Sequence, residues 1–500
     1  MAKKKAAPKP KTTAKKTAKG AATGKSELPN ARCVRVRMYC QGLGDCFLLT
    51  FPRKRGGRDF QMLIDCGVIL GTPSAGERMQ QVVGDIFTTT NGVIDLLVGT
   101  HEHWDHISGF EQAKEQFKKF DIKQTWLAWT ENPKDKLANE LREEREEKKK
   151  KLALALDHFR RLGLHETDGP ARQTHFQLAG LASFFGIDLA AAAQEGIGKT
   201  AEAMEFLRKT EAQFLKPFEV PPALDISADI DIFVLGPPTD KKLLKKDLPT
   251  KKGKEVYEEH EAHAFTSLVG LDAPDETGRQ ESQPFDNRMG MPLRSAMSDP
   301  YFVQMYDNGL DEHPAAWRRI DDIGMFAATD LALKLDADTN NTSLVLAIRL
   351  PNGKVLLFPG DAQVGNWESW HALEKHDKRA TMPELLANTV IYKTGHHGSH
   401  NATLSDLGLE MMTSTDLTAL LPVDEDVAHN NKGWRRMPFI PLMNELHRRT
   451  GGRIMRVDHE RKHPATDMKG GSKRNWTLSE AKFTSEPIRS LYLETIVEWK

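Results

Sequence analysis

The sequence feature that most constrains the fold and the chemistry is the heptapeptide Thr100-His101-Glu102-His103-Trp104-Asp105-His106. It follows directly after residues 95–99, a short apolar run that is typical of a buried strand, and residues 109–117 after it have a helical pattern. On such a strand-to-helix turn, side chains one, two and five residues apart can converge. Imidazole nitrogen and carboxylate oxygen are ligands that zinc and its neighbours prefer. We therefore predict a metal site here.

Two later segments repeat this arrangement of a strand followed by ligand-type residues. The apolar run 355–358 leads to Asp361, and the run 389–394 leads to His396 and His397. Active sites are commonly assembled at the edge of a β core from several strand ends, because a rigid scaffold fixes their geometry. Two adjacent cations need a bridging carboxylate and imidazoles, and a water between them becomes a nucleophile near neutral pH. The three segments together predict a hydrolytic two-metal site.

Composition and length describe an ordinary folded protein. The 500 residues, 39% hydrophobic and 28% charged, allow two or three domains, or one large domain with insertions. No apolar run approaches the ~18 residues of a membrane span, and no apolar segment follows the N-terminal lysines as in a secretory signal. We expect a cytoplasmic protein. The four cysteines, Cys33, Cys40, Cys46 and Cys66, form no CxxC pair and indicate buried free thiols, with a structural zinc site as the alternative.

The formal net charge of zero conceals an asymmetry along the chain. Residues 1–26 contain nine lysines and no acid, whereas the rest of the chain has 61 basic and 70 acidic residues. Residues 1–30 have almost nothing to bury, so we predict a disordered tail. The tail could bind a polyanion such as nucleic acid, or it could only improve solubility.

Periodicity predicts the remaining elements. Strands are expected at 34–38, 46–51, 61–65, 123–130, 229–235, 340–350 and 491–499, and helices at 76–91, 134–162, 200–215 and 439–450. The helix at 134–162 has Glu–Lys pairs at i,i+4 spacing, which favours a solvated arm over a docking element. Residues 240–335 are polar and weakly periodic, so we expect short helices and an active-site cover there. His260 and His263 in this region are interpreted as surface residues.

These motifs resemble the metallo-β-lactamase fold, in which HxHxDH, a later Gly-Asp and a histidine at a subsequent strand end occur in this order. The resemblance implies an αββα sandwich of two mixed sheets flanked by helices. Four stretches are further similar to the hydrolase domain of bacterial DNA-uptake (competence) channel proteins, although the membrane channel is absent: Gln41-Gly42-Leu43-Gly44-Asp45, Ile64-Asp65-Cys66-Gly67, residues 340–346 and residues 393–399. The implied organisation is a tail (1–30), two domain halves (31–130 and 336–500) and a mostly helical insertion (131–335) with one core strand near 229–235.

The resemblance also implies roles for individual residues. His101 and His103 would hold one divalent cation, Asp105 and His106 the second, and Asp361 would bridge them. His396 is our preferred completion of the second site, with His397 as the alternative. Many members have a third histidine for the first cation where this chain has Asn341, and an oxygen-richer site favours manganese over the default zinc.

Further candidates lie beside these ligands. Asp65 at a strand end is placed to orient metal ligands from behind. Ser399 is a candidate for the same kind of position. His400 is a proton donor to a leaving group, a residue that orients a ligand, or a surface residue. The resemblance implies a metal-dependent hydrolase in which a metal-bound hydroxide, oriented by Asp105, attacks a phosphodiester. A hydrolase of a lactone, thioester or β-lactam, and a non-catalytic module of a bacterial assembly, are the alternatives.

Overall fold

The computed structural model describes most of the chain outside the N-terminal tail. The described residues are 28, 32–54, 56–161, 170–187, 199–226, 229–246, 291, 293–296, 298–306, 320–458 and 476–499. The predicted disordered tail therefore lies almost wholly outside the described residues, as do His260 and His263.

Eight strands form the larger of two mixed sheets, in the order β15-β16-β1-β2-β3-β5-β7-β8. Neighbouring strands are antiparallel from β15 to β3 and parallel from β3 to β8. The bounds are β1 Cys33–Tyr39, β2 Cys46–Phe51, β3 Phe60–Cys66, β5 Leu96–Gly99, β7 Thr125–Ala128, β8 Ala212–Leu215, β15 Trp476–Leu478 and β16 Tyr492–Glu498, and β4 (Val93–Ile94) pairs separately with β6 (Asp121–Ile122).

The second sheet has six strands in the order β14-β13-β12-β11-β10-β9. Its strands are parallel from β14 to β11, and β10 and β9 complete it in antiparallel pairs. The bounds are β9 Asp231–Gly236, β10 Val345–Arg349, β11 Val355–Phe358, β12 Thr389–Lys393, β13 Thr418–Leu421 and β14 Ile454–Arg456. Because β5, β11 and β12 all run toward the predicted ligand residues, the ends of both sheets contribute to one region.

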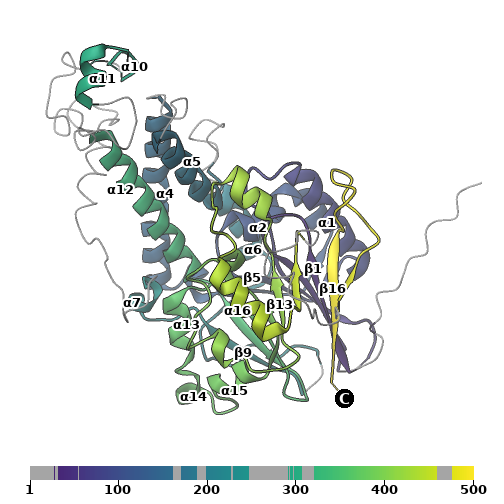
Figure 1. The fold of residues 1–500 in the computed structure, drawn as a ribbon. Coiled ribbons are helices and arrows are strands. Elements are labelled where there is room, and N and C mark those ends of the chain that lie inside the picture. Colours follow the sequence, from purple (N-terminus) through teal and green to yellow (C-terminus); the bar gives the residue numbers. More distant parts are fainter. Residues whose placement is uncertain are drawn as a thin grey trace, which may run out of the picture.

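Two hydrophobic cores show how the layers are stacked. One core joins residues of both sheets, and Phe47 of β2 meets Phe358 of β11 edge-on at 5.6 Å between ring centroids. The other lies on the far face of the six-stranded sheet, where Leu357 packs among helix residues such as Leu335 and Leu446. Two mixed sheets thus pack together with helices outside, as in an α/β sandwich (Figure 1).

The helices are distributed over the sandwich and over an arm that projects from it. The arm consists of α4, α5 and α12, with α10 and α11 at its far end (Figure 1). The bounds are α1 Ala75–Thr90, α2 Trp104–Gln112, α3 Lys114–Phe117, α4 Lys136–Arg161, α5 Pro170–Ala182, α6 Lys199–Lys209, α7 Lys241–Leu244, α10 Leu293–Ala296, α11 Pro300–Tyr306, α12 Ile320–Asn340, α13 Val364–Trp370, α14 Leu373–His376, α15 Met382–Ala387 and α16 Ile440–Thr450, with short turns η1 Trp129–Glu131, η2 Ser183–Phe185, η5 Gly395–Gly398, η6 Leu409–Met411 and η7 Val427–Asn431.

The structure differs from the sequence predictions in the insertion. The helix expected at 200–215 ends at Lys209, because Glu211 has left-handed backbone geometry (φ 49°), and Ala212–Leu215 pairs with β7 as a strand. The insertion therefore contributes two strands to the sheets where we predicted one. The short helices expected in residues 240–335 are present as α7, α10 and α11. The insertion also ends in the 21-residue helix α12, which includes Asn340, so the strand expected from residue 340 begins at Val345.

The charged helix at 134–162 is present as α4, but the prediction that it is a solvated arm is wrong along one face. Arg145, Lys149, Leu152, Leu156 and Phe159 are buried and recur at helical spacing. The i,i+4 pattern gave no sign of this because Arg145 and Lys149 pair with Glu102 and Glu131, which lie outside α4.

Two further expectations concern the cysteines and membranes. Cys33, Cys40, Cys46 and Cys66 are buried free thiols, and the groups of described residues that could hold a metal contain no cysteine. Within the described part of the chain, no helix has the length and apolar character needed to cross a bilayer.

Candidate metal centre

The candidate centre forms where the loop after β5 meets the turns after β11 and β12. The backbone packs closely here: a Cβ on Gly67 would lie 2.4 Å from the carbonyl carbon of Asp105, and one on Gly44 would lie 2.7 Å from its carbonyl oxygen. Asp45 donates its N–H to that same carbonyl at 2.9 Å. The glycine-punctuated turn at 41–45 and the Asp-Cys-Gly turn at 65–67 therefore hold the start of α2 in place.

Four ligand atoms converge into one compact group. Asp105, His106, Asp361 and His397 each offer an atom, and these atoms all lie within 4.8 Å of one another. His106 Nε2 lies 3.1 Å from Asp361 Oδ2 and 3.6 Å from Asp105 Oδ2, and His397 Nε2 lies 2.6 Å from Asp105 Oδ2. Ligands bound at ~2.1 Å to one cation lie roughly 3–4 Å from each other. All four side chains are fully buried, so the group has the spacing and enclosure of a metal site.

The unpartnered atoms in this group point to the same conclusion. His106 Nε2, Asp361 Oδ2 and Asp105 Oδ1 are buried and have no hydrogen-bond partner. A buried polar atom without a partner costs about 1–3 kcal/mol, so such atoms normally have an explanation. His106 Nε2 and Asp361 Oδ2 are close to each other without hydrogen-bond geometry. A shared cation would satisfy both atoms.

The preferred ligand in the turn after β12 is not the one we predicted. His397, and not His396, joins Asp105, His106 and Asp361. The other ring nitrogen of His397, Nδ1, lies 2.8 Å from the carbonyl oxygen of Pro422. Both histidines have left-handed backbone geometry, with φ 42° at His396 and φ 52° at His397. Two consecutive non-glycine residues of this kind cost of order 1–3 kcal/mol each. This bent turn aims the second ring at the compact group and the first ring to another side.

The charge around His106 favours a cation. Burial disfavours the charged imidazole, but the surrounding carboxylates of Asp361, Asp45, Asp105 and Asp65 raise the pKa of His106 well above its usual value. Lys393 is the nearby buried lysine, with Nζ 2.6 Å from Asp361 Oδ1 and 2.7 Å from Asp45 Oδ2. Without a metal ion, a proton on His106 partly balances this excess of carboxylates. A divalent cation would do so more completely.

As the sequence suggested, the Asp65 carboxylate lies next to a candidate ligand and contacts the outer nitrogen of its ring. Its Oδ2 lies 2.7 Å from His106 Nδ1 and accepts the Thr100 hydroxyl at 2.7 Å, while Oδ1 accepts the Thr100 N–H at 2.8 Å. A carboxylate on the outer nitrogen fixes the tautomer and the orientation of a ligating histidine. Asp65 thereby leaves His106 Nε2 facing the compact group.

His101 and His103 form the second part of the centre. His101 Nε2 lies 3.0 Å from His103 Nδ1, and both side chains are buried. Burial lowers the pKa of His103 to about 3 and that of His101 well below its usual value. Both rings are therefore neutral near pH 7, which is the form that binds metals.

Asn341 does not supply the missing third ligand. Its Oδ1 accepts the backbone N–H groups of Gln363 and Asn366, and its Nδ2 donates to the carbonyl of Lys246. The side chain is therefore used to join loops. The nearby carboxylate of Asp336, on α12, was not among the predicted residues, because nothing in the local pattern distinguishes it from other helix acids.

His400 and Ser399 lie outside the cluster. His400 is exposed and meets Phe439 edge-on at 5.9 Å, and the Ser399 hydroxyl donates to the Asn401 side chain at 3.1 Å. Of the three interpretations of His400, its exposed position corresponds to the surface residue.

A buried ion network anchors the loop that carries His101 and His103. Between them, the Glu102 carboxylate lies 2.6 Å from Lys149 Nζ and 2.8 Å from an Arg145 nitrogen. Arg145 also pairs with Glu131, which in turn pairs with Arg208. Sequence analysis missed Glu102 because it was read only as a spacer between ligands.

Aromatic side chains cover the histidines on the side of the arm. Phe184 of η2 stacks on the His103 ring at 5.3 Å between centroids, and Phe185 meets the same ring edge-on at 5.0 Å. Phe184 also stacks on Trp434 at 4.8 Å. The insertion and the second half of the chain thus close over the centre together.

Comparison with known proteins finds no matching family model, no matching curated protein and no matching solved structure.

Proposed function

We propose that the protein is a metal-dependent hydrolase of the metallo-β-lactamase fold that binds two divalent cations and cleaves phosphodiester bonds. The observation that carries the proposal is the compact, fully buried group of Asp105, His106, Asp361 and His397 with its unpartnered ligand atoms. Two mixed sheets with outer helices, and ligand motifs at strand ends in the expected order, are compatible with that fold.

The chain's own residues prepare the site for this chemistry. Asp65 orients His106, Lys393 holds Asp361, and the Glu102 network fixes the loop between the two histidines. Bound cations lower the pKa of water toward neutrality and offset negative charge on a phosphate. Because the candidate ligands are buried and held in place, such charge stabilisation would be strong there.

The phosphodiester substrate is supported by the charge of the N-terminal tail. Its nine lysines within residues 1–26 would attract a polyanion, and binding through them would weaken as salt increases. A lactone or thioester is not a polyanion, so these lysines would not attract it in the same way. We therefore place nucleic acid or a nucleotide ahead of carboxylic substrates.

The test measures metal content and phosphodiesterase activity in the same preparations. Purified protein is analysed for bound metal and is assayed on bis-p-nitrophenyl phosphate and on single-stranded and duplex DNA, with added zinc or manganese. We expect His397→Ala to lose activity and tightly bound metal. His400→Ala is the matched control, because it removes a nearby histidine outside the cluster, and we expect it to retain both.

The outcomes separate the candidate functions. Equal cleavage by wild type and by His397→Ala or His103→Ala would refute the proposed site. Bound metal without phosphodiesterase activity would direct the search to lactone, thioester or β-lactam substrates. Protein that binds no metal and shows no metal-dependent turnover would favour a non-catalytic module.

A further inference from the structure

We propose that Asp45 and Lys393 act as a positioning pair for the metal centre: Asp45 fixes the lysine, and the lysine fixes which oxygen of Asp361 faces the cations. This inference rests on the metal centre of the proposed function. It assigns a role there to two buried residues that lie outside the compact group of four candidate ligands.

The ammonium group of Lys393 is surrounded by three oxygen atoms from two distant parts of the chain. It donates hydrogen bonds to Asp361 Oδ1 at 2.6 Å and to the Gly360 carbonyl at 2.8 Å, and it forms an ion pair with Asp45 Oδ2 at 2.7 Å. An ammonium has three N–H donors, so these oxygens match its donors in number. Contacts between an ammonium and a carboxylate are also stronger than those between neutral groups. The lysine therefore has one defined position, between the loop before β2 and the turn after β11.

The two oxygens of Asp361 are divided between this lysine and the centre. Oδ1 accepts the Lys393 ammonium and also the backbone N–H of His396 at 2.9 Å. Oδ2 has no hydrogen-bond partner and lies 3.1 Å from His106 Nε2. Because Oδ1 is occupied, Asp361 offers only Oδ2 to a cation. Without the ammonium, Oδ1 would keep a single donor and could turn toward a cation beside Oδ2.

Asp45 connects the lysine to the rest of the centre. Its backbone N–H donates to the Asp105 carbonyl at 2.9 Å, and its own carbonyl accepts the Gly67 N–H at 2.9 Å. Its side chain contacts Lys393, which in turn holds Asp361. One residue thus joins the loop before β2, the start of α2 and the turn after β11. Asp45 acts on Asp361 through the lysine.

A direct ligand role for Asp45 fits the contacts less well. Asp45, Asp65 and His106 do form a second compact group of described residues. Asp45 Oδ2 lies 3.7 Å from His106 Nδ1, but that nitrogen already lies 2.7 Å from Asp65 Oδ2. This is the outer side of the ring, whereas Nε2 faces the group of four ligands. The Lys393 ammonium lies beside Asp45 Oδ2, and its positive charge would repel a cation there.

Replacing Lys393 by methionine separates positioning from charge balance, because the two roles predict opposite changes. Removal of a positive charge beside the ligands would by itself make a divalent cation bind more tightly. Loss of an outer partner of a ligand instead weakens metal binding by roughly 10–100-fold. We expect Lys393→Met to weaken binding of Zn²⁺ or Mn²⁺ by about this factor, measured by competition with a chromophoric chelator. Unchanged or tighter binding would overturn the inference.

A double-mutant cycle tests whether Asp45 acts through the lysine. Asp45→Ala should weaken metal binding by a larger factor in the wild-type background than in Lys393→Met, where the lysine is already absent. Equal factors in the two backgrounds would show that the residues act independently and would overturn the pairing. If Lys393→Met does not fold, the double variant Asp45→Asn/Lys393→Met has one buried charge fewer. It should then bind metal more weakly than Asp45→Asn alone.

Bound Co²⁺ reports the coordination geometry directly. If Oδ1 of Asp361 is released, it can join the coordination sphere, and a higher coordination number weakens the visible d–d absorption. We expect this decrease in Lys393→Met, and a spectrum identical to that of the wild type would count against the inference. Lys432→Met is the matched control, because it removes another buried ammonium, which contacts the Leu70 carbonyl at 2.5 Å. It should retain the wild-type affinity and spectrum.

The results distinguish failure of this inference from failure of the proposed function. Wild-type protein that binds metal, with Lys393→Met that binds it equally tightly, would overturn the role of the pair and leave the metal centre in place. Equal weakening in Lys393→Met and Lys432→Met would also overturn the pair, because it would reflect a general loss of packing. Wild-type protein that binds no metal would overturn both.

Discussion

Replacing Lys149 by methionine tests whether the arm helix α4 supports the metal-binding loop. The Lys149 ammonium is fully buried and lies 2.6 Å from Glu102 Oε1, 2.9 Å from Glu146 Oε1 and 3.3 Å from the Thr200 hydroxyl. Methionine retains most of the apolar stem and removes the charge. The substitution therefore isolates the electrostatic part of the contact between α4 and the loop.

The magnitude follows from the charge that remains behind. Burial alone would raise the pKa of Glu102, but Arg145 and Lys149 lower it well below its usual value, so Glu102 is ionised at neutral pH. Breaking a buried ion pair by removing one partner costs about 3–5 kcal/mol. Because Arg145 still contacts Glu102 at 2.8 Å, we expect the lower end, about 3 kcal/mol of unfolding free energy. The loop between His101 and His103 should also lose order, which should weaken metal binding by roughly 10–100-fold.

The assay combines guanidinium unfolding with metal competition at neutral pH. Lys150→Met is the control, because it makes the same change on an exposed position of the same helix, and we expect it to change stability by less than about 0.5 kcal/mol. The double variant Lys149→Met/Glu102→Gln should be more stable than Lys149→Met, since it leaves no under-compensated carboxylate. Wild-type stability in Lys149→Met, or a double variant less stable than the single one, would refute this reasoning.

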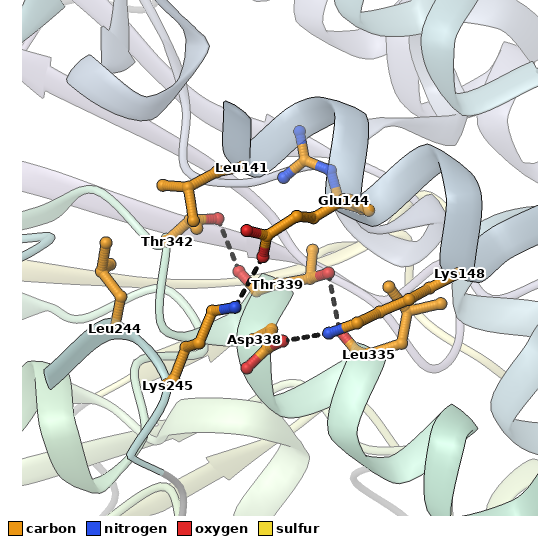
Figure 2. A pocket seen from close by; sticks show the side chains of 10 residues that line it. Leu141, Glu144, Lys148, Leu244, Lys245, Leu335, Asp338, Thr339 and Thr342 are labelled. Atoms are coloured by element: carbon orange, nitrogen blue, oxygen red, sulfur yellow. Dashed lines mark hydrogen bonds and ion pairs between the residues drawn. The ribbon is translucent and has the colours of Figure 1, made fainter. Parts of the chain in front are cut away.

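Two more predictions concern the aromatic cover and the seam between α4 and α7. Phe184→Ala should expose His103 and accelerate removal of bound metal by a chelator. Phe176→Ala, on the exposed side of α5, is the control and should not change this rate. Equal rates of metal removal in both variants would contradict a covering role for Phe184. At Glu144, burial raises the pKa, but ion pairs with two lysines at α7, of which Figure 2 shows Lys245, lower it to about 2. The contribution of these ion pairs to folding stability is therefore present above pH about 4.5 and is lost as the pH falls toward 2. The difference in unfolding free energy between wild type and Glu144→Gln should be below about 1 kcal/mol because the pair is partly exposed, and it should disappear in acid; a difference that does not vary with pH would argue against the ion pairs.

Local patterns were sufficient to predict the elements that carry the candidate ligands. A short apolar run that ends in His101, Asp361 or His396 is visible within a window of ten residues, and β5, β11 and β12 lie where these runs predict them. Strand periodicity and the spacing of HxHxDH depend on backbone geometry over a few residues. For this reason the sequence by itself determined the strand ends at which the chemistry would gather.

The tertiary structure decided which side chains meet there. The choice of His397 over His396 depends on two left-handed residues in one turn. The approach of Asp336 to His103 and the burial of Lys149 depend on how α12 and α4 pack against the sandwich. Such contacts join residues far apart in the chain, and their energies come from desolvation and charge pairing in the folded interior. A local pattern contains no information about those partners, so only the packed molecule could identify them.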